Sequence, residues 1–192
     1  ERRTSLMRTH SGLHVLSAIV LRDFGAPVTG GNMEPLIARM DFDLSDVPPD
    51  FKQRVEDACN EAVRLNRRID VRVLPREQAM AIPNIIRTAS DLLPPDIEMV
   101  RIVDIDGIDI QADGGTHVAS TAMIGRIAVT KMESKGRGFR RLRIRIEDAD
   151  KFFKIIVTPD DGSEEIVYDR LPKSQRLATM SVEGSERLMV DG

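Results

Sequence analysis

The stretch GRIAVTKMESKGRGFRRLRIRI, residues 125–146, indicates the fold class of this chain. Two strand-like runs, 125–132 and 139–146, flank the segment SKGRG at 134–138. Glycines between two such runs favour a reversal of the chain, because glycine adopts the positive φ that tight turns require. The pattern predicts a β-hairpin, and therefore an antiparallel sheet.

Helical and strand-like segments are mixed along the rest of the chain. Apolar residues recur at helical spacing from 8 to 22, and Pro48-Pro49-Asp50 opens a second helix with an apolar stripe from Phe51 to Leu65. We expect a turn at 29–32, a short helix at 76–81, and strands at 37–44, 69–74, 98–103 and 108–111. Because helices and strands do not alternate strictly, the sequence predicts an α+β fold with helices packed on an antiparallel sheet.

The composition is that of an ordinary globular protein. The formal net charge of −3 excludes a basic protein overall, and the single cysteine, Cys59, is predicted to be a small core residue in a reducing compartment. No apolar run approaches the ~20 residues that span a bilayer, and no signal peptide is recognisable. We therefore expect a cytoplasmic protein that does not contact a membrane.

All three histidines of the chain fall in two short motifs. His10 and His14 lie one turn apart on the first expected helix, so their imidazoles project from the same face. His117 ends the motif DGGTH at 113–117, in which a carboxylate and an imidazole flank a glycine-rich turn. Three nitrogens and one oxygen are an acceptable tetrahedral set for zinc. The predicted metal ligands are His10, His14, Asp113 and His117.

Several of these residues also have a second interpretation. A histidine pair at this spacing can be partly buried at a helix edge, and Asp113 can cap a turn. Asp113 is also a candidate general base if it is not a ligand. Thr116 lies next to a ligand and is a candidate catalytic residue that contacts the substrate. Asp41, on the expected strand 37–44, either hydrogen-bonds a ligand histidine or faces solvent.

The order of the motifs resembles that of a known family. HSGLH at 10–14, MDFD at 40–43, DGGTHV at 113–118 and the basic hairpin after them resemble the editing domain of alanyl-tRNA synthetase and its free-standing AlaX relatives. A related editing domain occurs in threonyl-tRNA synthetases. The resemblance covers roughly residues 5–147. It implies zinc held by the two histidine motifs and hydrolysis of tRNA(Ala) mischarged with serine or glycine, a translation-fidelity activity.

The domain prediction follows the resemblance. We expect a metal-binding catalytic domain at 1–148 and a C-terminal extension at 149–192, in which 154–158 and 164–168 predict a second hairpin. The family carries cysteine where this chain has Asp113, so a hard oxygen replaces a soft thiolate and another divalent ion can replace zinc. Longer members carry a small β-barrel upstream, so we expect this chain to be a short or trimmed form.

A basic row is predicted on the second strand of the hairpin. Apolar residues at even positions from 142 to 146 alternate with arginines at odd positions, so one face packs on the core and the other displays guanidinium groups. Such a row suits the phosphates of tRNA, although it is equally a solvated face paired with Glu133 and Glu147. The predicted tRNA contacts are Lys135, Arg137, Arg140, Arg141, Arg143 and Arg145.

Three functions are compatible with this pattern. The first is a metal-dependent deacylase of mischarged aminoacyl-tRNA, with tRNA(Ala) as its partner. The second is a catalytically weakened tRNA- or RNA-binding module in which Asp113 has spoiled the metal site. The third is a metal-dependent hydrolase of another small ester, which would have no use for the arginine row. Metal content separates the first two.

Overall fold

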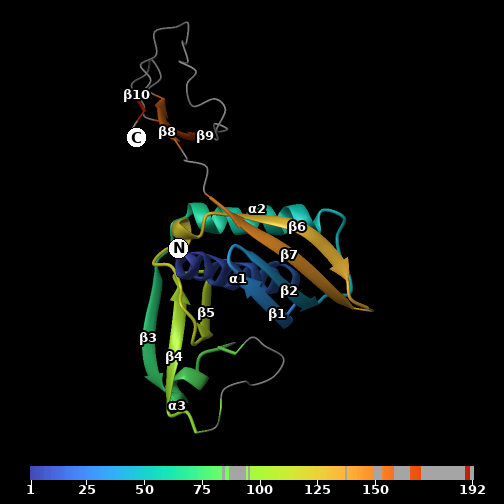
Figure 1. Cartoon of the computed structure of the whole chain (residues 1–192), viewed down its shortest axis with the longest axis vertical. Helices are drawn as coiled ribbons and strands as arrows, with labels where there is room; N and C mark the ends of the chain where they lie inside the picture. Colours follow the sequence, from blue (N-terminus) through green and yellow to red (C-terminus); the bar gives the residue numbers. More distant parts are fainter. Residues whose placement is uncertain are drawn as a thin grey trace, which may run out of the picture. The chain divides into compact units, whose positions relative to one another are not determined.

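The computed structural model describes residues 1–83, 85–86, 94, 96–136 and 138–148, and the backbones of strands at 153–157, 165–169 and 189–190 (Figure 1). The chain divides into two compact units, Glu1–Glu147 and Asp148–Gly192. In the described residues, the first unit contains a four-stranded and a three-stranded antiparallel sheet together with its helices. This arrangement confirms the predicted α+β class.

The long helix α1 (Arg2–Phe24) packs on one face of the four-stranded sheet. Its glycine at position 12 permits a close approach, because a Cβ there would lie 2.9 Å from Cδ1 of Ile146. Buried and outward residues alternate along the strand that contains Ile146, so its even positions face α1. The strands, in sheet order, are β1 (Val28–Glu34), β2 (Ile37–Asp43), β7 (Phe139–Glu147) and β6 (Arg126–Ser134).

The predicted hairpin is confirmed as β6 and β7, which pair antiparallel. The turn predicted at 29–32 is wrong, since these residues lie in β1 and pair with β2. The chain reverses instead at Pro35 and Leu36, where Leu36 has a φ of 65°. A Cβ on Gly31 would lie 3.3 Å from the carbonyl oxygen of Arg39, so this glycine permits a close approach of the neighbouring strand.

Helix α2 (Phe51–Arg64) covers the free edge of β6. The buried Asn60 donates from Nδ2 to the carbonyl oxygen of Ile127 at 2.8 Å and accepts from the Ile127 N–H at 3.0 Å. The carboxylate of Glu56 accepts from the N–H of Val129 at 2.8 Å. These bonds occupy backbone groups that an edge strand would otherwise offer to another chain. Cys59 is fully buried in the core, as predicted.

The three-stranded sheet brings the second histidine motif to the N-terminal helix. Its strands are β3 (Ile69–Pro75), β4 (Met99–Ile105) and β5 (Asp109–Ala112), in that order. The short helix α3 (Arg76–Met80) follows β3, and the short helix η1 (Thr121–Ile124) precedes β6. Strand β5 contacts α1, so the loop that follows β5 begins beside the helix that carries His10 and His14.

The second unit contains β8 (Phe153–Val157), β9 (Glu165–Asp169) and β10 (Met189–Val190), arranged in the order β10–β8–β9. Strands β8 and β9 pair antiparallel, close to the second hairpin predicted from the sequence. The turn between them lies outside the described residues. Among the residues that were described, no helix has both the length and the apolar character needed to cross a membrane.

Candidate metal centre

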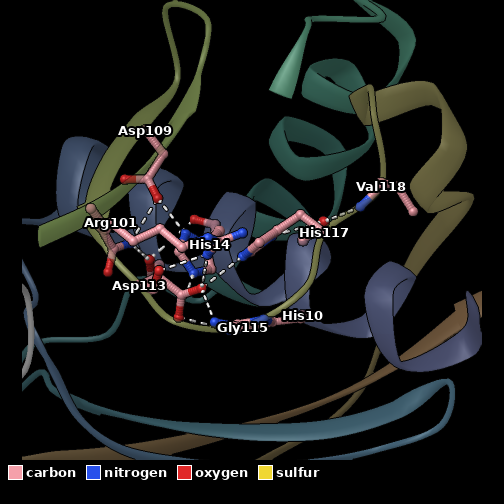
Figure 2. Close-up of polar contacts among 11 residues, drawn as sticks. His10, His14, Arg101, Asp109, Asp113, Gly115, His117 and Val118 are labelled. Carbon is pink, nitrogen blue, oxygen red and sulfur yellow. Dashed lines mark hydrogen bonds and ion pairs between the residues drawn. The ribbon is translucent and has the colours of Figure 1, made fainter. Parts of the chain in front are cut away.

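The two histidine motifs meet in the first unit. One potential ligand atom from each of the four predicted residues lies within 4.8 Å of the others. His10 and His14 come from α1, whereas Asp113 and His117 come from the loop after β5, and Figure 2 shows their side chains converging. The rings of His10 and His117 stack with centroids 4.3 Å apart. The ring of His14 meets both edge-on, at 5.0 and 4.7 Å.

Asp113 lies at the centre of this cluster. Its Oδ1 is 3.4 Å from Nε2 of His10 and 3.9 Å from Nε2 of His14, and its Oδ2 is 3.0 Å from Nε2 of His117. The N–H of Gly115 donates to Oδ2 at 2.7 Å. Burial alone would raise the pKa of Asp113, but hydrogen bonds with His10, His117 and His14 outweigh it and hold the pKa below its usual value. The group at the centre is therefore a carboxylate anion.

The histidines differ in what lies behind each ring. Nδ1 of His14 is 2.9 Å from Oδ2 of Asp109, whereas Nδ1 of His117 is 3.1 Å from the hydroxyl of Ser11. Burial lowers the pKa of His14, but hydrogen bonds with Asp109 and Asp113 leave it raised overall. Burial also lowers the pKa of His117, and there the hydrogen bond with Asp113 does not compensate. The cluster therefore favours a neutral imidazole at His117.

The cluster fits a divalent cation. Three imidazoles and one carboxylate form an N₃O donor set that zinc accepts. The Nε2 atoms of the three histidines all face the carboxylate of Asp113, so the donor atoms point toward one centre. Nδ1 of His10 is buried and has no hydrogen-bond partner in the described part of the chain. A Cβ on Gly115 would lie 2.5 Å from that nitrogen. Only glycine at this position leaves the His10 ring in its present place.

A cavity of about 510 Å³ opens beside His10, His14 and Asp113. Its walls are largely apolar and include Leu13, Val28, Met40 and Met99. Among the described residues that line it, the one permanent cation is Arg101 of β4. Arg101 donates from Nη1 to the main-chain oxygen of Asp113 at 2.6 Å, and the same nitrogen is 3.5 Å from Oδ2 of that residue. The sequence analysis did not identify Arg101.

Two further predicted residues lie elsewhere. Thr116 is exposed on the loop between Gly115 and His117. The suggestion that Asp41 supports a ligand histidine is wrong, because Asp41 accepts two hydrogen bonds from Arg141, at 2.6 and 2.7 Å, on the outer face of the sheet. Asp109 has the position that was proposed for Asp41. Asp109, Gln111 and Asp113 were detectable as alternate positions along one strand and its continuation.

The odd-numbered arginines of the row, Arg141, Arg143 and Arg145, lie on the sheet face opposite α1, because they alternate with the buried side chains that pack on this helix. Much of the row's charge is paired. Arg141 binds Asp41, Nε of Arg143 donates to Oε2 of Glu133 at 2.8 Å, and Arg145 lies 4.0 Å from Glu147. Arg140 donates to Ser134 and Phe139. Lys135 is exposed, whereas Arg137 lies outside the described residues. The structure therefore does not bring the row together with the histidine cluster.

The α+β fold is consistent with a tRNA synthetase editing domain, and sequence comparisons support this class. Residues 100–143 match the family described as the threonyl and alanyl tRNA synthetase second additional domain. Over 142 residues the chain is 41% identical to the alanyl-tRNA editing protein AlaX-M of Saccharolobus solfataricus, a match covering 74% of this chain and 59% of that protein. It is 34% identical over 146 residues to an alanine–tRNA ligase of Pyrobaculum arsenaticum, covering 73% of this chain and 16% of the ligase. These similarities support an AlaX-type alanyl-tRNA editing protein, as the motifs predicted.

A shorter similarity concerns a different class of protein. A stretch of 50 residues, 26% of the chain, is 64% identical to the DNA-directed RNA polymerase subunit beta' of Saccharopolyspora erythraea and covers 4% of that subunit. The chain also spans only 59% of the AlaX-M protein. Its own activity, substrate and partner therefore need to be argued from the site.

Proposed function

We propose that this chain is a metal-dependent deacylase of mischarged aminoacyl-tRNA, with serine- or glycine-charged tRNA(Ala) as its substrate in the cytoplasm. The main observation in favour is that His10, His14, Asp113 and His117 converge beside a cavity of about 510 Å³. The similarity to a protein named for alanyl-tRNA editing supports the substrate class. The proposal also takes 1–148 as the catalytic domain and 149–192 as an extension.

The three histidines and Asp113 would hold one zinc ion, or another divalent ion that prefers oxygen. A bound divalent ion supplies Lewis-acid chemistry, either by polarising the ester carbonyl or by lowering the pKa of water. If Asp113 is not a ligand, its carboxylate is placed to accept a proton from water as a general base. Both roles require the ionised form, which the low pKa of Asp113 provides.

The proposed reaction is hydrolysis of the ester between the amino acid and the terminal ribose. Water adds to the carbonyl carbon, the bond from this carbon to the ribose oxygen breaks, and that oxygen is released as a hydroxyl. The cavity wall is largely apolar, and Arg101 is the cation in this wall that can orient an ester oxygen or a nearby phosphate. Thr116, exposed on the loop after β5 that also carries Asp113, is proposed to contact the bound end of the tRNA.

The proposed tRNA-binding residues are the basic side chains of the β6–β7 hairpin. Arg143 and Arg145 keep side-chain exposures of 45% and 60% despite their carboxylate neighbours, so both can exchange these neighbours for phosphates. Arg141 is only 15% exposed in its pair with Asp41, which makes it a structural member of the row. We assign phosphate contact first to the exposed residues Lys135, Arg143 and Arg145, and after them to the half-buried Arg140.

Changing both Arg143 and Arg145 to glutamate is expected to weaken tRNA binding and to make the negative slope of log affinity against log salt shallower by about 1.4, since each phosphate contact to a single strand contributes about −0.7. The measurement is a binding titration with tRNA at several salt concentrations. Arg72→Glu is the matched control, because Arg72 is also exposed and paired with a carboxylate, that of Asp104, but lies on the other sheet. An unchanged salt slope in the double variant would exclude this face from tRNA binding.

The experiment that tests the function is deacylation of serine- and glycine-charged tRNA(Ala) by the purified protein, with bound metal quantified on the same sample. We expect hydrolysis and about one zinc per chain. Metal without hydrolysis of either tRNA, but with turnover of a free serine ester, would favour a small-ester hydrolase. The absence of both metal and hydrolysis would favour the binding module, an alternative that the cluster of four donors does not support.

A further inference from the structure

A carboxylate lies directly behind one of the proposed ligands. Asp109 is the first residue of β5, its side chain is fully buried, and its Oδ2 lies 2.9 Å from Nδ1 of His14. An ionised carboxylate only accepts hydrogen bonds, so the proton of the imidazole lies on Nδ1. In the neutral ring, the form that binds a metal, the lone pair of Nε2 is then left on the side that faces Asp113, at 3.9 Å from Oδ1.

Asp109 and His14 are joined in a closed circuit of hydrogen bonds. Gln111, two residues along the same strand, donates from Nε2 to Oδ2 of Asp109 at 2.7 Å and to the hydroxyl of Ser17 at 3.3 Å. Ser17 in turn donates to the main-chain oxygen of His14 at 3.1 Å. The circuit ties β5 to α1 through side chains, and it fixes both the orientation and the tautomer of His14.

The three histidines are supported unequally. His117 has a neutral hydroxyl behind it, that of Ser11, and the buried Nδ1 of His10 has no hydrogen-bond partner within the described residues. His14 alone among them has a carboxylate at Nδ1. A carboxylate at that position raises the basicity of the other ring nitrogen and holds the ring, and the loss of such a partner typically weakens metal binding about 10- to 100-fold.

We propose that Asp109 is the positioning residue of the metal site, which orients His14 and strengthens it as a ligand without contacting the ion or the substrate. This inference rests on the proposed metal site. It identifies His14 as the best-ordered ligand of the cluster, and Gln111 as the residue that holds Asp109 in place.

The test is the affinity of the metal-free protein for zinc, measured by competition with a chromophoric chelator in the absence of tRNA. Asp109→Asn keeps the shape of the side chain and removes its charge. We expect zinc affinity to fall about 10- to 100-fold, while the thermal midpoint of the metal-free protein stays near that of the unchanged chain. Asp104→Asn, on the adjacent strand and paired with Arg72 at the surface, is the control and should bind zinc normally.

Zinc affinity in Asp109→Asn equal to that of the unchanged chain would overturn the proposal. So would a loss of affinity matched by an equally large loss of stability in the metal-free state, because that result describes a purely structural residue. If Asp109→Asn does not fold, Gln111→Leu keeps the carboxylate and removes one of its donors, and weakened zinc binding is again required. Zinc binding that depends on Asp109 in a chain inactive on charged tRNA would contradict only the proposed function.

Discussion

Replacing His117 with alanine is expected to remove bound metal and deacylase activity together. The side chain of His117 is 2% exposed, and its two nitrogens lie 3.0 Å from Asp113 and 3.1 Å from Ser11. Without this ring only three of the four donors remain, and one side of the site is open. We expect zinc to fall from about one per chain to a small fraction. The deacylation rate should fall by more than about 100-fold, the upper end of the effect of losing a residue that only hydrogen-bonds a ligand.

The measurement combines metal analysis with a deacylation time course on the same preparation. Gln53→Ala, an exposed change on α2, controls for handling and should retain both properties. A variant that loses zinc but still deacylates would show that the ion is not needed for the reaction. A variant that retains both would move the functional centre away from this cluster.

The features predicted correctly from the sequence depend on local periods. The turn of a helix places His10 and His14 on one face, and alternation along β7 separates its arginines from its core residues. The proximity of His117 to the helical pair is not local, and it was inferred because all the histidine of the chain falls in two motifs. This long-range contact was predicted because a metal site needs several ligands close to one point.

The errors concern contacts that strand register determines. Asp41 lies opposite Arg141 across β2 and β7, and no pattern within either strand specifies that register. The same pairing leaves Arg141 less available to phosphate than its neighbours. In contrast, Asp109, Gln111 and Asp113 alternate along the chain, so a polar face beside a predicted ligand was visible in an otherwise apolar strand. Alternation of polar residues, rather than the identity of a single aspartate, was the informative signal for supporting residues.

The surroundings of Asp113 bear on whether this replacement of the family's cysteine impairs the metal site or provides a functional ligand. Its carboxylate accepts the N–H of Gly115 at 2.7 Å and lies 3.5 Å from the guanidinium of Arg101, which also binds its main-chain oxygen. Oδ2 is therefore held by donors within the chain, while Oδ1 faces His10 and His14. A single sulfur atom could not serve both sides in this way. The contacts support Asp113 as a residue to which the site is adapted.

Replacement of Asp113 by asparagine is expected to separate the two roles that remain open for this residue. The change keeps the shape but removes the negative charge, so a ligand role predicts zinc affinity at least about 100-fold weaker, beyond the usual effect of an outer partner. A general-base role predicts near-normal zinc affinity with turnover reduced about 100- to 10,000-fold. We expect the first result, because Oδ1 faces two of the three imidazoles. Zinc affinity and turnover that both match the unchanged chain would exclude both roles.

Asp113→Cys provides the complementary test. The thiolate is a softer donor, so this variant should prefer zinc over manganese more strongly than the unchanged chain does. It gives up the contacts of Oδ2 with Gly115 and Arg101, so its deacylation rate should not exceed that of the unchanged chain even when zinc is fully bound. Competition between zinc and manganese, followed by turnover with each ion, measures both effects. A cysteine variant with much faster turnover would mean that Asp113 weakens the site, and that the contacts around its carboxylate do not serve catalysis.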